Sequence, residues 1–204
     1  MGILSSSVTL TRYLTLEPVP DDFWAEIPDR LKKNSFRDID HTADERSFGW
    51  VSFDDMLDNN WSSGTPHKAH YLAFALRLDT RRIPPAVMKK HLRLAMDQAR
   101  QELEEKGRKF LSRDEKKEIK ENVKLKLFAR TLPIPAVFDV VWDTSSGLIY
   151  FGSTSPKARQ LFEDVFYTTF QMHLEPQTPY YRTIRLMGED HKALLDDLEP
   201  ALLA

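Results

Sequence analysis

The chain has 204 residues, of which 41% are hydrophobic and 29% charged, so it can bury the core of a folded domain. It contains no cysteine, which excludes disulfides, a thiol nucleophile and cysteine-ligated metal sites. No run of about 18 apolar residues is present, so we expect no membrane span. The N-terminus lacks the basic and apolar regions of a secretory signal, and we expect a cytoplasmic protein.

The net charge of −2 hides an uneven distribution of charge along the chain. Residues 81–130 contain 16 Lys and Arg against 8 Asp and Glu, which is a net charge of +8. The rest of the chain contains 13 basic and 23 acidic residues, which is a net charge of −10. A positive segment in an otherwise acidic chain favours an anionic partner for that segment.

The first third of the chain is predicted to form strands with one helix between them. Apolar and polar residues alternate with the period of a half-buried strand. Asp21 is expected to cap a helix that carries Phe23, Trp24, Ile27 and Leu31. Residues 54–66 are rich in Asp, Asn, Ser and Gly, which indicates a loop. The predicted strands are Val8–Leu16, Ser47–Phe53 and His70–Asp79.

The basic segment is predicted to form two helices. Pro84 and Pro85 suit the first turn of a long helix, and Gly107 suits its C-terminal cap. The apolar stripe of this helix is Met88, Leu92, Ala95, Ala99 and Leu103. Residues 112–115, Ser-Arg-Asp-Glu, match a capping box that begins a second helix. The second apolar stripe is Ile119, Val123 and Leu127, and the short link predicts an antiparallel helical hairpin.

The last third of the chain returns to mixed structure. We expect strands at Ala136–Trp142 and Leu148–Gly152 joined by a turn, and then a helix from Ser155. Tyr180–Leu186 is predicted to be a last strand and Asp190–Leu203 a short helix. This order predicts an α+β fold, with an antiparallel sheet core and packed helices in residues 1–80 and 131–204, and a basic helical hairpin inserted at residues 81–130.

The second helix of the hairpin carries a row of cations. Arg113, Lys117, Lys120 and Lys124 recur at spacings of 4, 3 and 4, which places them on one face, away from the apolar stripe. They span roughly 16 Å of helix, over which duplex DNA presents several phosphates. No base-reading motif is visible, so such binding would be led by phosphates and independent of sequence. The alternative is a solvated helix face, because Lys and Arg are good helix formers and pair with nearby Glu.

A second candidate site lies in the polar loop. Asp54, Asp55 and Asp58, together with His67 or His70, carry the groups that could hold a divalent metal for phosphodiester cleavage. The alternative is a turn whose Asp side chains bond their own backbone. Trp61 in this loop is the aromatic residue least easily explained as core, and stacking on a base is an alternative for it. Phosphate-binding glycine motifs and a hydrolase elbow are missing, so we assign no catalytic residue, metal or cofactor.

Seven short motifs occur in the same order as in a known family. Individually they are weak, but their order and spacing cover roughly residues 45–180. On these motifs the chain resembles the RdgC family, the bacterial recombination-associated proteins. The motifs are Gly49-Trp50-Val51, Ile83-Pro84-Pro85-Ala86-Val87, Gly107-Arg108-Lys109, Arg113-Asp114-Glu115-Lys116-Lys117-Glu118-Ile119-Lys120-Glu121-Asn122-Val123, Leu127-Phe128-Ala129-Arg130, Asp143-x-x-x-Gly147-Leu148-Ile149 and Ser155-x-Lys157-Ala158.

The resemblance implies a DNA-binding protein that limits access of the RecA recombinase to DNA, and a homodimer whose basic inner surface encircles duplex DNA. It identifies a short relative that lacks the C-terminal third, with Leu132 at a position where the family has an aromatic residue. Basic family positions fall on Lys109, Lys116, Lys120 and Arg130. We therefore expect non-specific binding of duplex or single-stranded DNA, a homo-oligomer and nucleoid association. A metal-dependent nuclease and a protein-interaction module without DNA binding are the alternatives. The expected DNA-binding residues are Lys106, Arg108, Lys109, Arg113, Lys116, Lys117, Lys120, Lys124 and Arg130.

Overall fold

The computed structural model describes residues 2–20, 22–105, 107–108 and 110–199, and its fold is α+β, as predicted. A seven-stranded sheet has the order β2-β4-β5-β6-β1-β7, with β3 paired to β4 beside this path. No helix in these residues is long and apolar enough to cross a membrane. The strands are β1 (Thr11–Thr15), β2 (Arg46–Ser52), β3 (His67–Lys68), β4 (Tyr71–Thr80), β5 (Ile134–Asp143), β6 (Ile149–Phe151) and β7 (Leu174–Pro176).

Antiparallel pairing joins the two ends of the chain in the sheet. Tyr13 of β1 lies opposite Ile149 of β6 on one side and opposite Pro176 of β7 on the other. β5 and β6 form a hairpin in which Trp142 faces Ile149. Gly147 has a φ of 72° in the turn of this hairpin, a left-handed conformation that glycine adopts without strain. The first and last thirds of the chain therefore belong to one sheet.

The chain divides into two compact units. Unit 1 comprises residues 1–35, 49–76 and 137–204, and unit 2 comprises residues 36–48 and 77–136. Unit 2 thus contains residues 36–48 in addition to the segment expected to form the hairpin. The helices of unit 1 are α1 (Phe23–Lys33), α4 (Pro156–Phe170), α5 (Pro179–Met187) and α6 (Lys192–Asp196), with a 3-10 turn at Glu189–His191. The helices of unit 2 are α2 (Pro85–Glu105) and α3 (Arg113–Phe128).

An aromatic cluster forms the core of unit 1. Trp50, Trp142 and Phe162 are fully buried, and α4 contributes further rings at Phe166 and Phe170 along one face. The rings meet edge-on or tilted in most pairs, the geometry that aromatic quadrupoles favour. The Trp50 indole donates a hydrogen bond of 2.8 Å to the Thr169 hydroxyl, which satisfies its buried N–H. This packing holds α4 and α1 together.

A single arginine organises residues 39–44 of unit 2. Arg81 is 2% exposed, and its guanidinium donates hydrogen bonds to the carbonyl oxygens of Ile39, Asp40, Thr42 and Asp44. Its backbone N–H donates to the carbonyl of Glu45 at 2.8 Å. Arg81, one of the basic residues that make residues 81–130 positive, therefore stabilises the loop of residues 39–44.

The C-terminal prediction is wrong in one element. Tyr180–Leu186 lies within helix α5 instead of forming a strand. Pro179 occupies the first turn, and the Thr178 hydroxyl accepts a hydrogen bond from the backbone N–H of Tyr181. These start signals outweigh the β-forming tendency of the Tyr, Thr and Ile residues that follow. The terminal helix is shorter than predicted, since α6 covers Lys192–Asp196, and residues 200–203 of that prediction lie outside the described residues.

Candidate nucleic-acid interface

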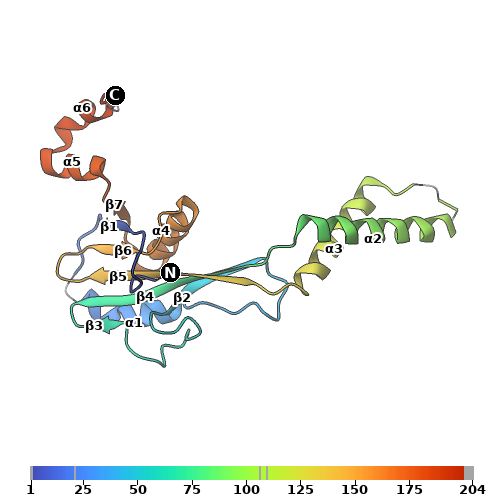
Figure 1. The fold of residues 1–204 in the computed structure, drawn as a ribbon, viewed down its shortest axis with the longest axis horizontal. Coiled ribbons are helices and arrows are strands. Elements are labelled where there is room, and N and C mark those ends of the chain that lie inside the picture. Colours follow the sequence, from blue (N-terminus) through green and yellow to red (C-terminus); the bar gives the residue numbers. More distant parts are fainter. Residues whose placement is uncertain (1, 21, 106, 109, 200–204) are drawn as a thin grey trace. The chain divides into compact units, whose positions relative to one another are not determined.

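Helices α2 and α3 lie side by side in unit 2 (Figure 1). Leu103 of α2 and Val123 and Leu127 of α3 are buried, and the rest of both predicted stripes is half-buried. The apolar stripes therefore pack as the periodicity predicts. We call these two helices the α2–α3 pair.

Local signals set the ends of both helices. Gly107 has a φ of 72°, and its N–H and that of Arg108 bond the carbonyls of Glu104 and Leu103, the pattern of a left-handed C-terminal cap. The Ser112 hydroxyl accepts from the N–H of Glu115, and the Glu115 carboxylate accepts from the N–H of Ser112 at 2.7 Å. These bonds to Ser112, together with Arg108, lower the pKa of Glu115. Both predicted caps are confirmed.

Four of the expected cations line one groove between the two helices. Arg113, Lys116, Lys117 and Lys120 of α3 surround a volume of ≈ 630 Å³ together with Leu92 and Met96 of α2. Asp114 is the acidic residue of this lining. Within the described part of the chain, none of the four cations has a carboxylate oxygen within 4 Å. We call this feature the cationic groove.

The cationic groove borders the apolar stripe of α3, which corrects the expectation that the basic face points away from it. Lys120 and Leu127 are seven residues apart, which is almost two helical turns, so they lie on nearly the same line along α3. The row of cations therefore lies directly beside the buried stripe of α3 and not on the opposite face of the helix. For this reason it lines a groove with Leu92 and Met96 of α2.

Further basic residues on α2 were not assigned to the site from the sequence. At about 100° per residue, Lys89, Arg93 and Arg100 lie within about 60° of Met96 around the helix axis, on one side of it. They therefore share the side of α2 that carries Met96, although none of them lines the cationic groove itself. Arg93 and Arg100 both form ion pairs with Asp97, at 3.8 and 3.3 Å. The same periodicity that identified the α3 row could have found them.

Lys124 lies at a second groove that shares Lys120 with the first. This groove has a volume of ≈ 880 Å³ and is lined by residues that include Arg82, Met88 and Ile134. The Lys124 ammonium forms an ion pair with Glu45 at 3.3 Å and lies 5.1 Å from the centre of the Phe128 ring. The ammonium of Lys124 is thus paired with a neighbouring carboxylate, unlike the four cations of the cationic groove.

The remaining expected residues are dispersed. Arg108 forms an ion pair with Glu115 at 3.0 Å beside the start of α3. Arg130 is exposed beyond the end of α3, outside the cationic groove. Lys106 and Lys109 lie outside the described residues. Leu132 is 74% exposed.

The acidic loop of unit 1 is organised by its own hydrogen bonds. Asp58 accepts from the hydroxyl and N–H of Ser63 and from the N–H groups of Ser62 and Asn60, and these bonds hold its pKa well below the ordinary value. Asp54 forms an ion pair with Lys68 at 2.7 Å. Across the described ranges, no three acidic or histidine side chains are grouped to hold a metal.

Trp61 also has a structural partner. Its indole N–H donates to the Ser35 hydroxyl at 3.1 Å, and its backbone has a φ of 59°. Trp50 and Phe74, two other aromatic residues of unit 1, are fully buried. Trp50 and Phe74 therefore serve packing, and Trp61 serves loop closure.

The fold and the cationic groove define an α+β protein with a basic helix pair. A family model described as "Putative exonuclease, RdgC" matches residues 12–187 of the 204. The chain therefore belongs to the RdgC family, as its motifs predicted, and this membership indicates a recombination-associated protein. No curated protein matches the chain well enough to count as a relative.

Proposed function

We propose that this protein binds DNA independently of sequence and modulates recombination by occupying DNA. The observation that carries the proposal is the cationic groove, in which Arg113, Lys116, Lys117 and Lys120 lie together without carboxylate partners among the described residues. Family membership supports a role in recombination.

The spacing of these cations suits a phosphate backbone. Arg113 and Lys120 are separated by about 10 Å along the helix, and duplex DNA carries a charge about every 1.7 Å of its axis. Lysine is a point charge on a flexible stem that suits phosphate oxygens, and contacts to phosphates carry no sequence information. The expected binding is therefore electrostatic and tolerant of sequence.

The nuclease alternative has no comparable support. Asp58 is occupied by hydrogen bonds from its own loop, and Asp54 is paired with Lys68. We infer a structural role for this loop, and DNA occupation remains the function that the described residues favour.

The test compares binding of two unrelated duplexes by fluorescence anisotropy at fixed salt. We expect the variant Arg113→Gln/Lys117→Gln/Lys120→Gln to lose affinity for both duplexes by at least about tenfold, because three phosphate contacts are removed. The control Lys32→Gln/Lys33→Gln/Lys157→Gln removes the same charge from exposed positions of unit 1 and is expected to bind nearly as tightly as the wild type.

Two results would contradict the proposal. Equal losses in the groove variant and the control would show that overall charge, not the groove, drives binding. Wild-type protein that fails to bind either duplex at low salt would leave the α2–α3 pair without a nucleic-acid role.

Sizing of the purified protein, with and without duplex, tests the homo-oligomer that the family resemblance predicts.

A further inference from the structure

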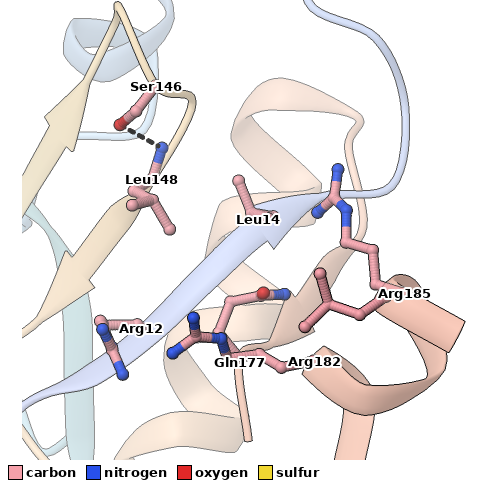
Figure 2. Close-up of a pocket in the computed structure, with 8 residues that line it drawn as sticks. Arg12, Leu14, Ser146, Leu148, Gln177, Arg182 and Arg185 are labelled. Atoms are coloured by element: carbon pink, nitrogen blue, oxygen red, sulfur yellow. Dashed lines mark hydrogen bonds between the residues drawn. The ribbon is translucent and has the colours of Figure 1, made fainter.

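A second group of cations surrounds a pocket in unit 1, separate from the cationic groove. The pocket has a volume of ≈ 390 Å³ and is formed by β1, the turn between β5 and β6, and the segment from β7 into α5 (Figure 2). All of these segments belong to unit 1. The lining residues are Arg12, Leu14, Ser146, Leu148, Gln177, Arg182, Arg185 and Leu186.

Three exposed arginines line this pocket, and its lining contains no carboxylate. Of the described residues, no acidic side chain forms an ion pair within 4 Å of Arg12, Arg182 or Arg185. Like charges gathered without a counter-ion repel one another, so an anion in the pocket would lower the energy of this arrangement. Arg185 also lines a neighbouring pocket with Glu175 and Glu189, and the inference therefore rests mainly on Arg12 and Arg182.

Backbone structure holds the two arginines in place. The N–H of Gln177 donates to the carbonyl of Arg12 at 2.7 Å, which ties β1 to the residues just before α5. Thr178 caps α5, and Arg182 lies in the first turns of that helix. Figure 2 shows the Arg12 and Arg182 side chains on one flank of β1, with Arg185 beside Leu14. The guanidinium groups thus come from a strand and a helix that the chain brings together only in the folded state.

The same pocket has an apolar side. Leu14, Leu148 and Leu186 line it, and Leu186 is 83% exposed. The ligand that matches both sides has a flat apolar part and a compact anionic part. A nucleotide has this composition, and its size suits ligand pockets of about 300–1,000 Å³.

Phosphate is the anionic group that the arginines fit best. The planar guanidinium presents paired N–H donors that match phosphate oxygens, and a phosphomonoester carries a charge of about −1.5 to −2. We propose that this pocket binds a nucleoside phosphate, with the phosphate on Arg12 and Arg182 and the base against Leu14, Leu148 and Leu186. The source is either a free nucleotide or the phosphorylated end of a DNA strand, which present the same chemistry.

The primary test is isothermal titration of the full chain with AMP, adenosine and inorganic phosphate. AMP is expected to bind at least tenfold more tightly than either part alone, since it engages both sides of the pocket. The variant Arg12→Gln/Arg182→Gln is expected to lose at least tenfold in AMP affinity. The Arg12→Lys/Arg182→Lys variant keeps the charge but loses the paired donors, and an intermediate affinity is expected.

Matched controls separate this site from the proposed DNA interface. Lys157→Gln removes an exposed cation of unit 1 that does not line the pocket, and unchanged AMP affinity is expected. The groove variant Arg113→Gln/Lys117→Gln/Lys120→Gln is also expected to bind AMP normally, so this proposal stands or falls independently of DNA binding by the groove. Circular dichroism of each variant confirms that it is folded.

A further arm distinguishes the two sources of the nucleotide. Tighter binding of a 5′-phosphorylated oligonucleotide than of AMP, lost in Arg12→Gln/Arg182→Gln, identifies a strand end. Competition by AMP alone, with no effect of the terminal phosphate, identifies a free nucleotide. The proposal is overturned if AMP binds no more tightly than adenosine or phosphate, or if the folded double variant binds AMP as the wild type does.

Discussion

The salt dependence of DNA binding provides a quantitative test of the cationic groove. Arg113, Lys116, Lys117 and Lys120 are its unpaired cations, so one groove can neutralise four phosphates. Each contact contributes about −0.9 to the slope of log affinity against log salt, which gives about −3.6 for four contacts. Affinity then falls about 150-fold between about 50 and 200 mM salt, or about 3 kcal/mol.

Removing two of these contacts changes the slope by a known amount. For Lys117→Gln/Lys120→Gln we expect a slope near −1.8 and a loss of about 12-fold over the same range of salt. Lys124→Gln is the matched comparison, because the ammonium of Lys124 is 3.3 Å from the Glu45 carboxylate. Its slope should change by clearly less than about 0.9. Anisotropy titrations at four salt concentrations measure all three slopes, and a double variant with the wild-type slope would refute the reasoning.

Three further predictions concern stability, each measured by urea unfolding. Arg81→Met is expected to lower the free energy of unfolding by about 3 kcal/mol, because the buried carbonyl of Ile39 and three part-buried carbonyls lose their donor and a buried unsatisfied group costs about 1–3 kcal/mol; a loss below about 1 kcal/mol would contradict this role. Because the pKa of Asp58 is lowered in the folded state, its ionised carboxylate contributes fully to the free energy of unfolding well above pH 3.8, and this contribution declines as the pH falls through and below that ordinary value. Asp58→Asn should therefore flatten the acid side of the profile of stability against pH. An unchanged profile counts against the hydrogen-bonded loop. Ser112→Ala is expected to cost about 1 kcal/mol through loss of the α3 cap, while Ser5→Ala, at an exposed position outside any helix, should cost much less.

Much of the secondary structure could be predicted because its signals are local. The capping box at Ser112 and the left-handed glycine at Gly107 act within a few residues, and both appear where the sequence placed them. The segment 180–186 shows the limit of this reasoning. Its composition suits a strand, and the cap at Thr178 and the proline at 179 determined the outcome.

The candidate interface could be predicted only in part, since the spacing of cations does not reveal their partners. Arg113, Lys117 and Lys120 share a groove as their spacing suggests, and Lys116 joins them. Lys124 belongs to the same row but faces Glu45, which is 79 residues away in the chain. The acidic loop illustrates the converse: the bonds from Ser62 and Ser63 to Asp58 are local, and the sequence already offered that interpretation as an alternative.

The periodicity of the sequence by itself determined that Pro85–Glu105 and Arg113–Phe128 form two amphipathic helices with a basic row, because each side chain's direction on a helix follows from its position along the chain. Tertiary structure alone decided which cations remain available to a ligand. Arg12 and Arg182 reach one pocket because β1 pairs with β7 just before α5, and long-range pairing of this kind leaves no mark in local spacing. A cationic side chain can bind an anionic ligand only where the fold places no carboxylate of the chain against it.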